Sequence, residues 1–144
     1  MEIWYLVADG ARARLFQTSQ LDGELEETDV YVNEYGRVQN RDLDRDRPGR
    51  IAKGGERRAS MEDDDGPREH EEKRFAKRLA EQLNAAFKRR DFERLGIIAA
   101  PKALGRIKGE LNDEVLDALV GTSSKNLTRS SRDDIREHIG DRLL

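Results

Sequence analysis

The order of apolar and polar positions along the chain predicts strands first and helices later. Residues 3–8 (IWYLVA) form a run of strand-favouring residues, and residues 11–16 alternate with the period of a second strand. A third such stretch covers residues 25–32. Asp9-Gly10 lies between the first two stretches, and this dipeptide favours positive φ in a tight hairpin turn. The chain is therefore expected to open as an antiparallel three-stranded meander.

From Pro67 onward the period changes to that of an amphipathic helix. Proline is tolerated in a first helical turn. One apolar stripe follows at steps of three and four residues, formed by Phe75, Leu79, Leu83, Ala86 and Phe87. Residues 95–100 (LGIIAA) are continuously apolar, as an interior strand is, and residues 101–110 predict a second helix that begins with a proline.

The last third of the chain completes the predicted sheet. The spacing in residues 114–121 fits a helix or a strand, and we favour a strand because a fifth strand completes the sheet. Ser130 or Ser131 is expected to cap a final helix over residues 133–143. The predicted order βββαβαβα indicates an α/β protein with a ribonuclease H-like, mixed five-stranded sheet and helices on its faces.

Residues 36–66 interrupt this pattern after the third strand. Their few apolar residues have no period, and a stretch of this length without an element of its own is uncommon in a small domain. Residues 37–58 hold eight bases against four acids, and four consecutive acids follow at residues 62–65. We interpret residues 1–144 as a single domain that presents residues 36–66 as a long, mobile, charged loop.

Composition narrows the class of protein. The chain has no cysteine, which excludes disulfides and thiolate metal sites. The first ten residues have an acidic residue, Glu2, at their head and then a short apolar run, so we expect neither a signal peptide nor a membrane span. A net charge of −3 gives no global attraction to nucleic acid or anionic lipid. We expect a cytoplasmic protein that needs no cofactor, and the oligomeric state stays open.

The acidic and nucleophilic residues do not indicate an enzyme. A nuclease of this fold needs several carboxylates on neighbouring strands, and Asp9 fits a turn residue better. His70 and His138 lack a metal-ligand spacing, and we expect both on solvated helix faces. The serines have no nucleophile-elbow context. The balance is therefore against catalysis and against a metal site.

The charged loop carries the candidate ligand contacts. Adjacent glycines let backbone N–H groups approach a ligand, and arginine forks bind phosphate. The predicted contacts to RNA or to a partner are Asp46, Arg47, Arg50, Lys53, Gly54, Gly55, Arg57 and Arg58, with Arg12 and Arg14 of the second strand as additions. Asp46 is expected to orient an arginine. Simple loop flexibility and a self-paired charged turn are the structural alternatives.

Several segments together resemble a known family. WYLVADGARARLF, DRPGR, FAKRLAEQLN, LGIIAAPKALGRIKGEL and KNLT resemble the bacterial family of proteins required for attachment to host cells, over nearly the whole chain. This family is similar to the middle domain of archaeal and eukaryotic class-I translation release factors and of the ribosome-rescue protein Pelota. That resemblance implies the same βββαβαβα layout.

The resemblance also implies a place for the loop. In release factors it carries Gly-Gly-Gln into the ribosomal peptidyl-transferase centre; here Gly54-Gly55 is followed by Glu56. The expected function is a non-catalytic module that contacts RNA or the translation machinery, plausibly the ribosome or tRNA. The alternative is a protein-interaction or host-attachment factor without RNA binding. A peptidyl-tRNA hydrolase is the weaker alternative, because a carboxylate replaces the neutral glutamine.

Overall fold

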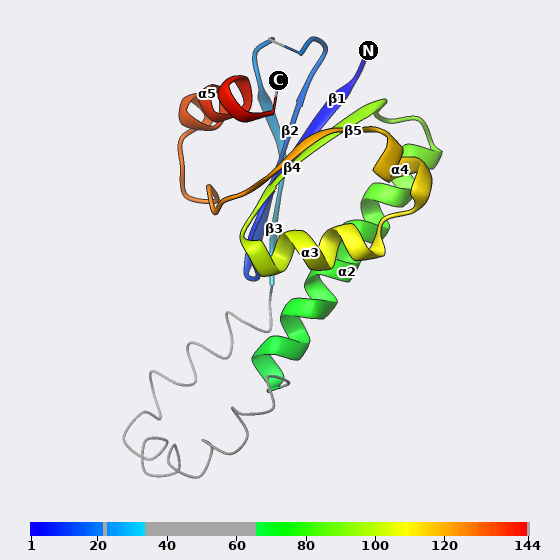
Figure 1. Cartoon of the computed structure of the whole chain (residues 1–144), viewed down its shortest axis with the longest axis vertical. Coiled ribbons are helices and arrows are strands. Elements are labelled where there is room, and N and C mark those ends of the chain that lie inside the picture. Colours follow the sequence, from blue (N-terminus) through cyan, green and yellow to red (C-terminus); the bar gives the residue numbers. More distant parts are fainter. Residues whose placement is uncertain (22, 34–65, 144) are drawn as a thin grey trace.

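The strands of the chain form one mixed sheet. A computed structural model of the protein describes residues 1–21, 23–33 and 66–143. Within these residues the strands are β1 (Ile3–Ala8), β2 (Arg12–Thr18), β3 (Glu26–Val32), β4 (Arg94–Ala99) and β5 (Leu119–Ser124). Their order across the sheet is β3-β2-β1-β4-β5 (Figure 1). Neighbours β1, β2 and β3 are antiparallel, whereas β4 and β5 run parallel to β1. The predicted α/β fold, with its antiparallel meander and mixed five-stranded sheet, is therefore confirmed.

Helices cover both faces of this sheet. The described helices are α2 (Pro67–Lys88), α3 (Pro101–Glu110), α4 (Asp113–Asp117) and α5 (Arg132–Arg142). The first three pack against one face, which we call the α2 face, and α5 packs against the other, the α5 face. Because successive side chains of a strand point to opposite faces, each strand contributes to both cores.

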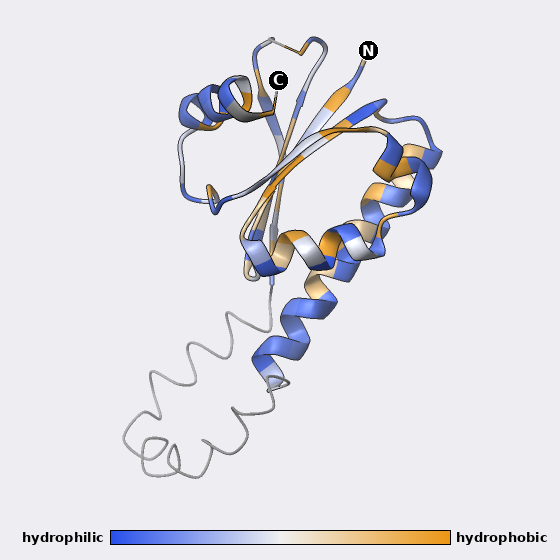
Figure 2. Ribbon diagram, in the orientation of Figure 1, coloured by the Kyte–Doolittle hydropathy of each residue, from blue (hydrophilic) through white to orange (hydrophobic). Residues whose placement is uncertain are grey.

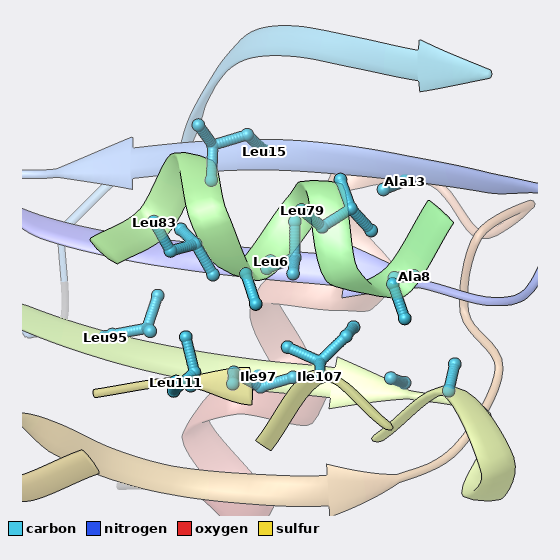
Figure 3. Packing of buried hydrophobic residues seen from close by; sticks show 14 of the residues in the cluster. Leu6, Ala8, Ala13, Leu15, Leu79, Leu83, Leu95, Ile97, Ile107 and Leu111 are labelled. Carbon is cyan, nitrogen blue, oxygen red and sulfur yellow. The ribbon is translucent and has the colours of Figure 1, made fainter. Parts of the chain in front are cut away.

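The α2 face buries the larger core. Leu6 and Ala8 of β1 and Ile97 of β4 point to this face and meet Leu79 of α2 and Ile107 of α3 (Figure 3). The stripe predicted on α2 is buried, except that Phe87 is only partly covered. Figure 2 shows hydrophobic residues where α2 and α3 turn toward the sheet and hydrophilic ones on the first turns of α2. This core fixes α2 and α3 relative to the strands.

The α5 face is built around one large ring over glycine. Tyr5 of β1 is fully buried, and its ring lies where Gly96 of the neighbouring β4 has no side chain. A Cβ atom at Gly96 would lie 2.5 Å from Cδ1 of Tyr5. Ile135 and Ile139 of α5 are fully buried over the same face. The small core of the α5 face therefore depends on the close packing of Tyr5 over Gly96 rather than on a large buried apolar area.

One predicted element is wrong in part. Residues 114–121 do not form a continuous strand: α4 (Asp113–Asp117) is helical, and β5 begins only at Leu119. Asn112 precedes two acids in the first turn of α4, an arrangement that the helix dipole favours. The fifth strand itself is present. At α5 the predicted cap is Ser131, whose side chain accepts a hydrogen bond of 3.0 Å from the backbone N–H of Asp134.

No helix in the described parts of the chain is both long enough and apolar enough to cross a membrane.

Candidate functional site

The site begins where β3 ends and α2 begins, because residues 34–65 connect these two elements in the sequence. Asn33 is the residue after β3, and only 3% of it is exposed. Its backbone N–H donates to the carbonyl oxygen of Ala11 at 2.8 Å. Its side-chain amide donates to the carbonyl oxygens of Gly10 at 3.2 Å and Glu71 at 3.4 Å. One buried asparagine thus joins the β1–β2 turn, β3 and α2.

A cluster of ion pairs holds the first turns of α2 against α3. Arg106 of α3, whose side chain is 17% exposed, pairs with Glu69 and, at 3.4 Å, with Glu72. Lys102 lies 3.9 Å from Glu69 at the start of α3. Partly buried arginine–carboxylate pairs are screened less than exposed ones. The first turns of α2, which follow residues 34–65 in the sequence, are therefore held at a defined position against α3.

Gly10 has an ordinary backbone conformation and lies close to the end of the Glu72 side chain. No described glycine has positive φ, so the positive φ expected at Asp9-Gly10 is wrong. A Cβ atom at Gly10 would instead lie 2.6 Å from the carboxyl carbon of Glu72. A side chain at residue 10 would have to displace the flexible end of Glu72, which lies between the turn and the first turns of α2.

Asp9 ties the same turn to the connection between β5 and α5. Its Oδ1 accepts hydrogen bonds from the backbone N–H groups of Ala11 at 2.8 Å and Arg12 at 2.9 Å. Its Oδ2 accepts from the side chains of Asn126 at 3.1 Å and Thr128 at 3.0 Å. Burial would raise the pKa of Asp9, but these hydrogen bonds hold it below its ordinary value. The prediction that Asp9 is a turn residue is confirmed.

Arg14 is engaged in the structure of the α5 face. It forms a bidentate pair with Glu27, with Nε–Oε2 at 2.9 Å and Nη2–Oε1 at 3.1 Å. Its Nη1 donates to the carbonyl oxygens of Thr128 at 3.2 Å and Ser130 at 2.6 Å. The hydrogen bonds from Arg14 hold the pKa of Glu27 below its ordinary value, against a smaller effect of burial. The described contacts of Arg14 are those of a clamp on the β5–α5 connection.

The remaining predicted contacts fall on different parts of the chain. Arg12 lies at the start of β2, opposite Val32 of β3, and is half-buried. It therefore belongs to the same end of the sheet as Asp9 and Asn33. The predicted contacts outside the described residues are Asp46, Arg47, Arg50, Lys53, Gly54, Gly55, Arg57 and Arg58. Their role as ligand contacts stays a prediction, as does that of Arg12 and Arg14.

Ser123 and His138 form a pair that sequence reasoning missed. Oγ of Ser123 in β5 lies 2.8 Å from Nε2 of His138 in α5. The expectation that His138 lies on a solvated helix face is therefore wrong, because this side chain is half-buried against the sheet. His70 is exposed, as expected. The packing of α5 against β5 depends on the tertiary fold, so no short sequence motif predicts the Ser123–His138 pair.

Among the described residues, no group of three or more histidine or acidic side chains is arranged to hold a metal ion. The polar groups at this end of the sheet instead satisfy one another through ion pairs and hydrogen bonds. This geometry can hold the two flanks of an inserted segment in place. We call it the anchoring end: the β1–β2 turn, Asn33, the first turns of α2 and α3, and residues 126–128.

The fold and the anchoring end define a mixed-sheet α/β protein that fixes both flanks of a charged insertion. The chain belongs to the family described as "Protein required for attachment to host cells", which it matches over residues 4–139. The family resemblance of the sequence is thereby confirmed. A comparison with curated proteins gave no match.

Proposed function

We propose that the protein is a non-catalytic binding module that contacts RNA of the translation machinery through residues 37–58. The observation that carries the proposal is the position of this segment. Its eight bases lie in sequence between Asn33 and Gly66, and the residues that flank it are tied to the anchoring end by partly buried hydrogen bonds and ion pairs. A cationic segment with fixed flanks loses less freedom when it binds a polyanion.

The resemblance to the middle domain of class-I release factors supports translation as the setting, in the cytoplasm. Gly54-Gly55 corresponds to the two glycines of the release-factor loop, and Glu56 takes the place of the glutamine. Among rRNA phosphates a carboxylate would be repelled, so hydrolysis of peptidyl-tRNA is disfavoured. Ester hydrolysis by the wild type that is lost in Glu56→Ala would instead support a peptidyl-tRNA hydrolase.

Co-sedimentation with ribosomes and fluorescence titration with a 20-nucleotide single-stranded RNA test the proposal. The test variant replaces Arg47, Arg50, Arg57 and Arg58 with glutamine. Its matched control carries the same substitution at four exposed cations away from the anchoring end, Lys88, Arg90, Arg94 and Lys108.

The wild type and the control variant should bind, and the test variant should not co-sediment. The slope of log K against log salt should fall by about 3 in the test variant if all four arginines meet phosphates of the single strand. Absence of RNA and ribosome binding in the wild type, or equal binding by both variants, would reject the proposal.

The family description favours a second candidate, a protein-interaction factor in attachment to host cells. In that case the charged segment would order against a protein surface. Crosslinking in cells separates the two candidates: RNA bound to residues 37–58 supports the first, and protein without RNA supports the second.

A further inference from the structure

We propose that the outer edge of β3 is a docking site for an extended peptide segment of a partner protein, with alternating basic and aliphatic side chains. This inference does not depend on RNA binding. β3 is an edge strand, and within the described residues only β2 pairs with it. An exposed edge presents unpaired N–H and C=O groups to which another strand can add.

The face of β3 toward α2 borders a groove of about 400 Å³ whose lining is part apolar and part polar, with Asp29, Gln82, Arg89 and Asp91 as its polar residues. Leu6, Leu15, Leu79 and Leu83 contribute apolar lining, and Tyr31 of β3 lines one side. This volume and lining are of the kind that accepts an aliphatic or aromatic side chain. A strand added to β3 would direct every second side chain toward this groove.

Trp4 gives the groove an unmet polar group. Its side chain lines the groove, and its indole Nε1 is buried without a hydrogen-bond partner among the described residues. A buried N–H without an acceptor is costly, because it has lost its bond to water. β2 and β3 separate Trp4 of β1 from a strand added at the outer edge, so this N–H is not a contact of the proposed peptide.

The opposite face of β3 sets the charge of the partner. A shallow depression of about 780 Å³ lies between the β2–β3 hairpin and the start of α5. Its lining includes Glu2, Glu24, Glu26 and Glu27, with Arg132 as the cation. Glu27 is already paired with Arg14, but Glu24 and Glu26 are exposed. Lysine or arginine side chains of an added strand would meet these acids.

The end of β3 adds exposed apolar surface on that same face. Val30 is 62% exposed and Val32 is 38% exposed. Their two-residue spacing matches the alternation of an added strand, and the apolar stems of its lysine or arginine side chains would cover them. A second copy of the chain fits less well. Antiparallel pairing over the whole of residues 26–32 would set Asp29 directly against Asp29, and like charges opposite each other are destabilising.

The test uses a fluorescent ten-residue peptide of alternating lysine and valine. Two control peptides have the same composition, one in blocks (five lysines, then five valines) and one with alternate backbone nitrogens methylated. The alternating peptide should bind at least tenfold more tightly than either control, and hydrogen exchange of the β3 amides should slow when it binds.

Two variants locate the binding to β3. Glu26→Lys reverses a charge of the depression, and Ala85→Trp fills the groove from an exposed position of α2. Each should weaken the alternating peptide at least tenfold. Glu137→Lys, an equal charge change at an exposed position of α5, should leave it unchanged.

Equal affinity for the alternating and block peptides, or unchanged affinity in both variants with their folds intact, would overturn the proposal. Concentration-dependent dimerisation that slows exchange at β3 without peptide would overturn it as well, because a second copy would then be the occupant. Ribosome binding by the wild type is read independently, so either proposal can fail alone.

Discussion

The two faces of the sheet are stabilised in different ways. The α2 face buries eighteen residues of the described chain in one apolar cluster, under three helices. The α5 face buries nine, under one helix. Polar contacts supplement the smaller core: Asp9 to Thr128, Arg14 to two carbonyl groups, Ser123 to His138, and the Ser131 cap. Apolar area thus dominates one face and directed hydrogen bonds the other.

This difference in stabilisation also gives the two faces different roles. A large apolar cluster is indifferent to pH and holds α2 and α3 rigidly. The polar contacts of the α5 face converge on the β5–α5 connection and the β1–β2 turn. The anchoring end is therefore supported from both sides, by packing through α2 and by hydrogen bonds through Asp9.

The largest expected effect is on the α2 face. Ile97 is fully buried in the interior strand β4, and Ile97→Ala should lower the free energy of unfolding by about 2–5 kcal/mol through lost burial and a cavity. Urea unfolding followed by circular dichroism measures it. Val30→Ala, at an exposed position of β3, should change stability by less than about 0.5 kcal/mol. Similar losses in both variants would contradict the assignment of the core.

Asp9→Ala should have the next largest effect, because it removes the acceptor of four hydrogen bonds. The expected loss is about 1.5–3 kcal/mol, as for hydrogen bonds to a charged group. Glu81→Ala, at an exposed position of α2, is the control. Hydrogen exchange should accelerate at residues 126–128 as well as in the turn, and acceleration in the turn alone would refute the link.

The Asp9 contribution should depend on pH in one direction. Its pKa in the folded protein is lower than the value of about 3.9 expected when unfolded. Its stabilisation is therefore complete above the unfolded pKa and is lost as pH falls through the folded pKa. The stability gap between the wild type and Asp9→Ala should be constant from pH 7 to 5 and should shrink below about pH 4. A gap that widens in acid would show that Asp9 is not stabilised as the carboxylate.

Gly96→Ala should cost about 1–3 kcal/mol, because the added Cβ would meet the buried ring of Tyr5. Gly105→Ala is a matched control in α3, where nothing lies within 4 Å of the new atom. Since glycine is unfavourable inside a helix, the control should gain about 0.5–1 kcal/mol. Opposite signs in thermal unfolding would confirm the close approach on the α5 face, and equal signs would exclude it.

The smallest effect is expected at the start of α5. Ser131→Ala removes the side-chain cap and should cost about 1 kcal/mol. Faster hydrogen exchange in the first turn of α5, with α2 unchanged, is the expected signature. Ser124→Ala, at an exposed position, serves as control. If hydrogen exchange in α2 accelerated equally, the two faces of the sheet would not be stabilised independently.

Local patterns predicted the fold well because each main element carries its own period. Residues 3–8 and 101–110 were placed with the bounds that the structure has, and α2 begins at the predicted Pro67. Residues 114–121 were ambiguous because a short helix and a strand follow one another within eight residues. Length could not distinguish the two elements there.

The anchoring end was predicted only in part. Asp9 was expected in a turn from its local context, but its partner Thr128 is 119 residues away. Nothing in the spacing of Asn33 indicated that it would be buried between a turn and a helix. Gly10 was expected for a positive φ that it does not have, and it lies beside the end of the Glu72 side chain. Contacts between distant segments depend on the assembled sheet, so no short motif carries them.

The long sequence separation of the Asp9 and Arg14 contacts has a consequence for synthesis. At a translation rate of about 5–20 residues per second, about 6–24 s pass between the emergence of Asp9 and that of Thr128. During this time Asp9 can bond to Ala11 and Arg12, and Arg14 to Glu27, but their contacts to residues 126–130 cannot yet form. The contacts that join this hairpin to residues 126–130 are therefore expected to form late in synthesis, and slowing translation near residue 128 should extend the period in which proteases can reach the hairpin.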